Sequence, residues 1–378
     1  MTTFFVDQSK IFTGHLTDQR DVNVNAHLED SLWSIRIYEK NETFGIEPAW
    51  NLLKPSENPR NDTLIAYRSS DFSNNTGNCG TDKLVSPIYF DEINLPSYTG
   101  LHGRTKRHNS KNTCLIYIVA DFSFFENRCK RHHLTCSALM ISLVHHVDAI
   151  FRKSKFQDSS FTIHTGIGIQ IGMLVLYTAF TYSADTVYPH FNAKGISWTA
   201  YTKLFSFSYF MSYIREKYCL CHLLTSHGMS NRILGLAYGN SICSSPRRGN
   251  TLESCGLSSD TDELFGPLPS VQLNLVMTHG HNFGSGHDPH NKQCSRPENQ
   301  GGNYIMWERA VSGKSPNNLL FSPCSLRNIG RKLETSTCLI SRKLFSTFCG
   351  NGIVDRGEEC DSGAIGIVNA DNCCSKYC

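Results

Sequence analysis

The sequence carries little charge. Asp, Glu, Lys and Arg make up 18% of the 378 residues, and the formal net charge is +3. Disordered chains combine high net charge with few apolar residues, whereas 40% of this chain is hydrophobic. The composition therefore indicates globular domains, and the length is enough for two or three of them. The small net charge argues against nucleic acid as a partner.

The apolar segments that direct a chain to a membrane are also missing. Residues 1–12 lack the apolar core of a signal peptide, so we expect the natural start to be missing. Residues 159–184 contain no Asp, Glu, Lys or Arg, but Thr, Ser, Gly, Gln and His interrupt them and no basic flank sets an orientation. This stretch favours a buried strand over 167–177 rather than a transmembrane helix.

Cysteine, by contrast, is abundant, with 16 in the chain. Cysteine-rich proteins are typical of oxidising compartments, and three N-glycosylation sequons begin at Asn41, Asn61 and Asn74. Together these features predict the secretory pathway. The chain ends at Cys378 inside a cysteine cluster, so we expect the C-terminal end to be incomplete too.

Short apolar runs alternate with polar turns in the first 107 residues, as at 34–38 and 63–67. This pattern predicts a small β-rich domain. Its single cysteine, Cys79, precedes a glycine. It is either an unpaired thiol or a thiolate that caps a zinc ion elsewhere in the chain.

A basic tetrad, Arg104-Thr105-Lys106-Arg107, follows in a polar loop. Its basic residues form either a cleavage site for a basic-specific processing protease or an ordinary solvated charge run. Because the composition changes directly after the tetrad, we expect a domain boundary at residue 107.

The next region alternates strands with helices. A continuous apolar run such as 115–120 predicts a central strand that is buried on both faces, and apolar residues at helical spacing predict a helix. The expected strands are 115–120, 167–176 and, at an edge, 234–238, and the expected helices are 134–151 and 197–218. Ser197 is the expected cap of the second helix. This alternation indicates an α/β fold.

Three histidines, His279, His281 and His287, then occur within nine residues. Residues 271–283 are expected to form a helix that Gly284 ends. From His281 onward the spacing is H-x-x-G-x-x-H, the downstream half of the metzincin zinc signature H-E-x-x-H-x-x-G-x-x-H. His281 and His287 are therefore candidate zinc ligands.

The upstream half of that signature is incomplete. Two positions are roughly 200° apart on a helix with about 3.6 residues per turn, so His279 should point away from the face of His281. The ligand position one turn before His281 holds Met277, and the general-base position holds Thr278. A thioether is a poor zinc ligand beside imidazoles, and a Thr hydroxyl cannot accept a proton from zinc-bound water at neutral pH. Placing Glu-Leu between His279 and Gly280 would restore the whole signature.

Two further features lie downstream. Met306, in the run 301–307, is either a core residue or a Met turn beneath the zinc ligands. From Cys349 the chain is rich in cysteine and poor in apolar residues, which predicts a disulfide-stapled module. Oxygen ligands that suit Ca²⁺ gather in this module, and the alternative for them is an acidic surface turn. They are Asn351, Asp355, Glu358 and Asp361.

These motifs resemble the ADAM family, the membrane-anchored disintegrin metalloproteinases, and within it the ectodomain sheddases similar to TNF-α converting enzyme. Besides the histidine segment, the resemblance is carried by residues 12–15, 46–48, 79–80, 104–107, 111–114, 119–121, 234–238, 301–302, 310–313 and 349–361. It implies a metzincin α/β domain with a mostly parallel, twisted sheet at 108–345. It also implies an N-terminally incomplete, β-rich prodomain at 1–107, with a cysteine switch at Cys79 and a furin-type site, and a truncated disintegrin domain at 346–378.

The resemblance implies an activity, a location and a disulfide pattern as well. The activity is zinc-dependent cleavage of membrane-anchored proteins, such as cytokine precursors and Notch-type receptors, by a single-pass protein of the cell surface that its own prodomain restrains. The implied disulfides are Cys114–Cys219, Cys243–Cys338 and Cys294–Cys324. The cysteines outside this pattern, whose pairing stays open, are Cys129, Cys136, Cys221 and Cys255.

Three hypotheses for function follow. In the first, the chain is a sheddase-type zinc endopeptidase by descent whose site is inactive or impaired, because the Glu and one correctly spaced His are missing. In the second, it is a non-enzymatic, secreted decoy that binds substrates or partners through the protease cleft. In the third, the helix unwinds and His279, His281 and His287 still bind zinc in a looped geometry.

Overall fold

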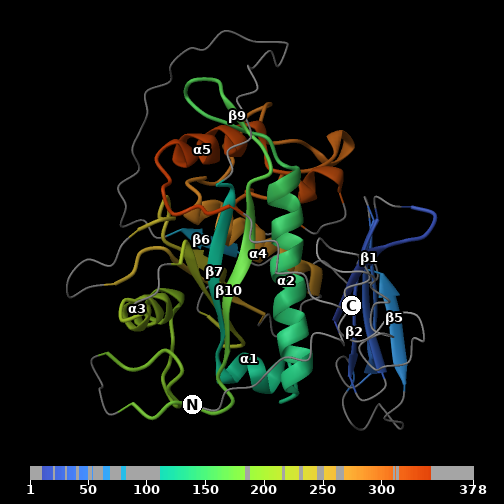
Figure 1. The fold of residues 1–378 in the computed structure, drawn as a ribbon, viewed down its shortest axis with the longest axis vertical. Coiled ribbons are helices and arrows are strands. Elements are labelled where there is room, and N and C mark those ends of the chain that lie inside the picture. Colours follow the sequence, from blue (N-terminus) through green and yellow to red (C-terminus); the bar gives the residue numbers. More distant parts are fainter. Residues whose placement is uncertain are drawn as a thin grey trace, which may run out of the picture. The chain divides into compact units, whose positions relative to one another are not determined.

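The computed structural model describes residues 11–19, 22–29, 32–39, 42–49, 53, 63–68, 78–81, 111–183, 188–214, 218–229, 233–244, 251–260, 268–309, 311 and 315–341. The chain divides into two compact units (Figure 1), residues 1–68 with 341–378 and residues 69–340. The boundary expected at residue 107 lies outside the described residues.

The first unit contains a five-stranded antiparallel sheet with the order β1-β2-β3-β4-β5. Its strands are β1 (Ile11–His15), β2 (Asn23–Glu29), β3 (Leu32–Tyr38), β4 (Thr43–Pro48) and β5 (Leu64–Arg68). An ion pair joins β3 to β4, with Arg36 Nη2 3.1 Å from Glu47 Oε1, and the Tyr67 hydroxyl of β5 donates to the same oxygen at 2.5 Å. The expected β-rich N-terminal region is confirmed.

The second unit is built on a six-stranded sheet with the order β10-β7-β11-β13-β12-β6. The first four strands are parallel, β12 runs antiparallel to β13, and β6 pairs in parallel with β12. The bounds are β6 (Asn78–Thr81), β7 (Thr113–Ala120), β10 (Gly168–Leu176), β11 (Leu220–Thr225), β12 (Ile233–Ala237) and β13 (Cys255–Ser259). A hairpin of β8 (Phe156–Gln157) and β9 (Ile163–His164) stands apart from it. The expected α/β fold with a mostly parallel sheet is confirmed.

Helices cover both faces of this sheet, with α2 (His133–Lys153) on one side and α3 (Ala200–Met211) on the other (Figure 1). The helix α4 (Leu268–Asn282) packs on β12 and β13 and contacts α2. The short α1 (Phe122–Asn127), the 3₁₀ turns η5 (Glu298–Gln300) and η6 (Pro316–Leu319), and α5 (Pro323–Glu334) complete the unit. In the described ranges, no helix has both the length and the apolar character that a membrane crossing requires.

The helix expected at 197–218 is shorter than that range. Thr199 rather than Ser197 caps it. The Thr199 hydroxyl oxygen accepts a hydrogen bond from the backbone N–H of Thr202, and the Thr202 hydroxyl oxygen accepts one from the backbone N–H of Thr199. The helix ends at Met211, and β11 begins at Leu220. Every residue of β11 is buried, and periodicity cannot distinguish a fully buried strand from a helix.

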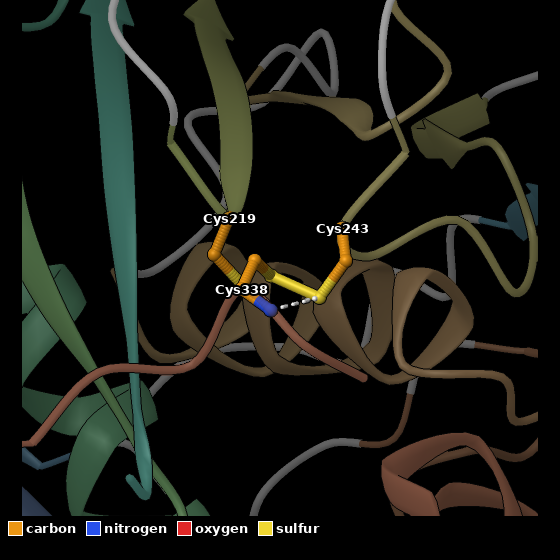
Figure 2. Close-up of side chains that lie close together, drawn as sticks. All are labelled: Cys219, Cys243 and Cys338. Atoms are coloured by element: carbon orange, nitrogen blue, oxygen red, sulfur yellow. Dashed lines mark hydrogen bonds between the residues drawn. A yellow bond between two sulfur atoms is a disulfide. The ribbon is translucent and has the colours of Figure 1, made fainter. Parts of the chain in front are cut away.

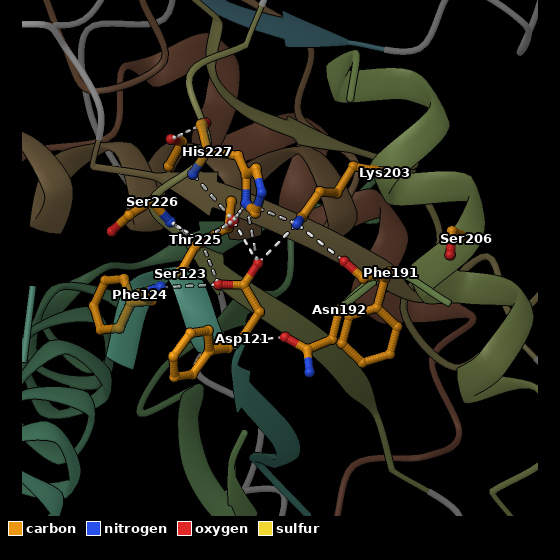
Figure 3. A network of polar contacts seen from close by, with 12 residues as sticks. Asp121, Ser123, Phe124, Phe191, Asn192, Lys203, Ser206, Thr225, Ser226 and His227 are labelled. Atoms are coloured by element: carbon orange, nitrogen blue, oxygen red, sulfur yellow. Dashed lines mark hydrogen bonds and ion pairs between the residues drawn. The ribbon is translucent and has the colours of Figure 1, made fainter. Parts of the chain in front are cut away.

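A buried ion pair joins α3 to the end of strand β7 (Figure 3). Lys203 Nζ lies 2.7 Å from Asp121 Oδ2, and both side chains are fully buried. Asp121 directly follows β7, and Thr225 at the end of β11 donates to it at 2.6 Å. Burial alone would raise the pKa of Asp121, but the charge of Lys203 and hydrogen bonds from His227, Lys203 and Ser123 hold this pKa well below 3.8. The cluster thus fixes the carboxyl ends of two strands against α3.

Candidate metal centre on the histidine helix

The helix α4 and the turn after it position all three histidines of the sequence motif. Its residues Leu275, Val276 and Met277 are buried in the apolar core. Its C-terminal end is held by Asn282, whose Nδ2 donates to the carbonyl oxygens of Tyr238 and Cys255 at 3.0 and 3.1 Å. The chain then turns at the glycine in position 284, where φ is 94°, a conformation that glycine adopts without a side-chain clash.

This turn brings His281 and His287 together, with 4.8 Å between the ring centroids. His281 is fully buried, and its Nδ1 lies 2.8 Å from the carbonyl oxygen of Ser285, which assigns the proton to Nδ1. No described residue hydrogen-bonds to Nε2 of His281 or to Nδ1 of His287. Burial, with the neighbouring His287, lowers the pKa of His281 to about 3. His281 therefore stays neutral above that pH, and the neutral imidazole is the form that binds a metal.

His279 faces a different element. It is fully buried, and its ring lies 4.8 Å from that of His222 in β11, edge to face. His222 in turn reaches Ser258 of β13, with 3.1 Å between Nε2 and Oγ. Burial lowers the pKa of His279 to about 3. Because α4 stays helical through this residue, the structure does not contain the looped arrangement of His279, His281 and His287.

The two positions that the zinc signature requires upstream of His281 hold other residues. Met277 is 1% exposed and packs in the apolar core. Thr278 is fully buried, and its Oγ1 donates to the Asn274 carbonyl at 2.7 Å. A catalytic zinc takes three protein ligands and keeps one position open. The pair His281 and His287 supplies two ligands, so the residues present do not fit a catalytic zinc.

Across the described ranges, the one gathering of three or more possible metal ligands consists of Cys219, Cys243 and Cys338. All three sulfurs are in disulfides, one of which is drawn in Figure 2. Cys243 and Cys338 are joined in a disulfide, and Cys219 is joined to Cys114. The Cys338 N–H donates to Cys243 Sγ at 3.2 Å. Metals bind thiolates, and none of these sulfurs is a thiolate.

The disulfides of the second unit include the three that the resemblance implies. These are Cys114–Cys219, Cys243–Cys338 and Cys294–Cys324. A fourth bond, Cys129–Cys136, joins the segment after α1 to the first turn of α2. Cys221 and Cys255 are buried thiols.

Met306 lies directly beneath α4. It is fully buried, and a Cβ atom at Gly280 would collide with its Sδ. The N–H of Asp288 donates to the Met306 carbonyl at 2.8 Å, and the Asp288 carboxylate accepts from Ser325 at 2.7 Å and from Ser322. The residue after the third histidine is thereby tied to the methionine segment and to the start of α5, which is a suitable position for a Met turn.

Cys79 lies in β6, where its backbone is in register with Gly235 of β12. The other predicted sites fall outside the described residues. These are the processing residues Arg104, Lys106 and Arg107, the calcium candidates Asn351, Asp355, Glu358 and Asp361, and the sequons at Asn41, Asn61 and Asn74.

Sequence reasoning missed His222, the partner of His279. The signal was a histidine within the mostly apolar run 220–224, and it was missed because that run adjoins the helix prediction that extended too far, to residue 218. It also missed the pair of Asp121 and Lys203, whose side chains come from segments about 80 residues apart (203 − 121 = 82). No local pattern reports such a distant contact.

Comparison with known proteins identifies a peptidase family that this chain matches. Residues 110–322 match the family model Reprolysin_5, described as metallo-peptidase family M12. The chain is 27% identical over 410 residues to disintegrin and metalloproteinase domain-containing protein 10 of Rattus norvegicus. This alignment covers 97% of this chain and 52% of the relative. The Homo sapiens protein of that name is 27% identical over 409 residues, with the same coverage.

A third relative, a disintegrin and metalloproteinase domain-containing protein 17 homolog of Caenorhabditis elegans, is 28% identical over 308 residues, 71% of this chain and 43% of the relative. The chain thus spans about half the length of the curated relatives it matches.

Proposed function

Because the chain belongs to metallo-peptidase family M12 and, within it, to the ADAM family of disintegrin metalloproteinases, we propose that it is a sheddase-type endopeptidase by descent whose site is inactive or badly impaired in this form. One observation carries the proposal: Met277 and Thr278 stand at the positions for the first zinc ligand and the general base, and His279 lies against His222. Loss of general-base catalysis alone lowers a rate by about 10²–10⁴-fold.

The loss of a ligand adds to this effect. A zinc ion held by His281 and His287 alone lacks the third protein ligand that catalytic zinc sites use, so it should be retained poorly. When bound in a complete site, zinc polarises the scissile carbonyl and lowers the pKa of its water. Neither contribution is available without stable binding, so the two defects reinforce each other.

The proposed targets are membrane-anchored proteins in the secretory pathway or at the cell surface, such as cytokine precursors or Notch-type receptors. The names of the relatives support the peptidase and disintegrin assignment. The four disulfides support an oxidising compartment.

We propose further that residues 1–107 act as a prodomain whose strand β6 occupies the edge of the six-stranded sheet next to β12. The support is the pairing of β6 with β12, because β6 takes up the backbone hydrogen-bonding edge of the strand that packs beside α4. An extended substrate would need such an edge to bind by strand addition. Cys79 lies in this added strand.

Reinsertion of the missing residues tests the central proposal. In a Cys79→Ala background, Glu-Leu would be inserted after His279, and cleavage of a fluorogenic peptide would be followed with one equivalent of zinc added. We expect no turnover from the uninserted chain and clear turnover from the inserted one. The matched control inserts Gln-Leu, which restores the helical register but not the general base, and should bind zinc while remaining about 10²–10⁴-fold slower.

Two results would contradict the proposal. Turnover by the uninserted chain within tenfold of the Glu-Leu variant would show that the register of α4 is not decisive. Failure of the folded, zinc-loaded Glu-Leu variant to cleave any peptide would remove the argument from descent.

The alternative is a binding module that uses the same cleft without turnover. It is favoured by the retention of the sheet, the disulfides and the buried supports of His287, including the contacts of Asp288, although the catalytic positions are replaced. Immobilised chain should then retain the ectodomain of a membrane-anchored shedding substrate intact. Lack of any retention, with the Glu-Leu variant as the positive control for substrate engagement, would exclude this function.

A further inference from the structure

Two buried thiols lie side by side in the centre of the sheet. Cys221 of β11 and Cys255 of β13 are directly paired in the parallel ladder, and they are 1% and 0% exposed. Both belong to the apolar cluster beneath α3, together with Phe207. Successive side chains of a strand point to opposite faces, and His222, the next residue of β11, faces α4. The two thiols therefore share the α3 face of the sheet.

The spacing of this pair is that of a disulfide. Neighbouring strands lie about 4.7–4.9 Å apart, and disulfides join Cα atoms about 4.4–6.8 Å apart. The four bonds already formed span 5.2, 5.0, 5.2 and 5.9 Å between Cα atoms. The two side chains also hydrogen-bond to each other, and burial followed by this contact raises the pKa of Cys255. No large backbone movement is needed to join them.

The oxidation state of the surrounding cysteines points the same way. Residues 111–340 contain ten cysteines, and eight of them are already joined in four disulfides. A compartment that oxidises those pairs also exposes Cys221 and Cys255 to oxidants before they are buried. After folding, the raised pKa and the burial protect the pair from reagents, so its state is set while the sheet assembles.

We propose that Cys221 and Cys255 are a dithiol–disulfide pair that closes to a fifth bond among the described residues when the chain folds in an oxidising compartment. One thiolate attacks the disulfide of an oxidant, either a protein disulfide oxidoreductase or glutathione disulfide, displaces one oxidant sulfur as a thiolate and forms a mixed disulfide with the other. The second thiolate attacks the cysteine sulfur of that mixed disulfide, the Cys221–Cys255 bond forms, and the remaining oxidant sulfur leaves as a second thiolate. Two electrons pass to the oxidant, and the two cysteines lose two protons. The inference does not depend on whether the chain cleaves peptides.

The bond would extend a series of cross-links across the sheet. Cys114–Cys219 already joins β7 to the residue before β11, and Cys221–Cys255 would continue the series to β13. The Cys255 carbonyl accepts from Asn282 Nδ2 at 3.1 Å and from the Tyr238 N–H at 3.2 Å. Closure would therefore also stiffen the strand on which the end of α4 rests.

Thiol counting decides the state of the pair. The full chain would be secreted from cultured cells, its thiols alkylated with iodoacetamide in denaturant without reductant, and the number of alkyl groups read by intact mass. If the bond forms, Cys221→Ala frees Cys255 and the count rises by one relative to the unsubstituted chain. If both cysteines are thiols, the same substitution lowers the count by one. The double variant Cys221→Ala/Cys255→Ala should leave the count unchanged in the first case and lower it by two in the second.

The matched control is Cys294→Ala, which frees Cys324 from a bond present in the structure and should raise the count by one. Peptide mapping of the unsubstituted chain without reductant is independent of the folding of any variant. A peptide containing Cys221 linked to one containing Cys255, two hydrogen masses below their sum, supports the proposal. Alkylation of both cysteines, or a bond from either one to a different cysteine, overturns it.

Discussion

The contact between Gly280 and Met306 leads us to expect that replacing Gly280 by Ala destabilises the protein, although the same substitution usually stabilises a helix. Replacing Gly by Ala inside a helix normally stabilises it by about 1 kcal/mol. At Gly280 the new Cβ would collide with Met306 Sδ and lie 3.1 Å from Cε, in a region where Met306 is fully buried. Overpacking of a buried site costs about 1–3 kcal/mol. Because the collision is with a buried atom, we expect Gly280→Ala to lower the free energy of unfolding by about 1–2 kcal/mol.

A double-mutant cycle isolates this contact. Met306→Ala alone should cost about 2–5 kcal/mol, as for other buried large-to-small changes. In that background the nearest remaining atom is Phe321 Cε1, 3.3 Å from the new Cβ, so Gly280→Ala should lose its collision and become stabilising by up to about 1 kcal/mol. The sign reversal corresponds to a coupling energy of about 2–3 kcal/mol. Urea unfolding followed by circular dichroism measures all four free energies.

The matched control is Gly239→Ala, since nothing lies within 4 Å of a Cβ built at that glycine, and it should change stability little. The reasoning is refuted if Gly280→Ala stabilises the chain in the presence of Met306, or if its effect is the same with and without the methionine. Either result would mean that Met306 does not support α4 at the residue between His279 and His281.

Three other predictions concern buried polar groups and a cross-link. Lys203→Met leaves the Asp121 carboxylate buried without its cation and should cost about 3–5 kcal/mol in urea unfolding, most of it recovered when Asp121→Asn is added. Burial holds the pKa of His279 at about 3, below its ordinary 6.5, so its contribution to stability is complete above pH 6.5 and is lost as the pH falls toward 3. Between pH 7 and pH 5 the unfolding free energy of the unsubstituted chain should therefore fall by about 2 kcal/mol more than that of His279→Phe. The same pH dependence in both proteins would contradict this. Replacing Cys243 and Cys338 by Ala opens a link across 95 residues and should cost about 4–5 kcal/mol by the chain-entropy estimate, read as a lower midpoint in the same assay.

The parts of the fold that the sequence predicted well are those with a strong local pattern. The uninterrupted apolar run at 115–120 predicted the central strand β7, and helical spacing predicted α2 within two residues at each end. The strand β10 was recognisable because its uncharged stretch was too polar for a membrane span. In each case burial left a local trace in the chain, as a run of apolar or uncharged residues or as helical spacing.

Other features depend on contacts that leave no such trace. The sequence 220–225 is fully buried in β11 and continues an apolar pattern, so the end of α3 could not be found from periodicity. The edge-to-face contact of His279 with His222 depends on a strand about 57 residues away (279 − 222 = 57). Angular spacing predicted that His279 would not share a face with His281, but it could not name what His279 would meet instead.

The arrangement around α4 explains how the histidine helix keeps its place without the residues of a complete zinc signature. Its C-terminal end is fixed by Asn282, which donates to Tyr238 and Cys255, and by the turn that follows. These contacts determine where His281 and His287 lie, so the altered spacing has to be accommodated on the N-terminal side of His281.

On that side, two glycines of the sheet leave space for the helix side chains that the altered spacing places against them. The absence of a Cβ at Gly235 and Gly256 leaves room for Asn274 and Thr278, which lie against these two glycines of β12 and β13. Thr278 meets its own hydrogen-bonding need within the helix, through the Asn274 carbonyl, so a buried polar residue at this position costs little. A helix can therefore change which residues point toward the candidate metal centre without losing its packing, because packing depends on volume and hydrogen bonding, whereas catalysis depends on which atoms point at one site.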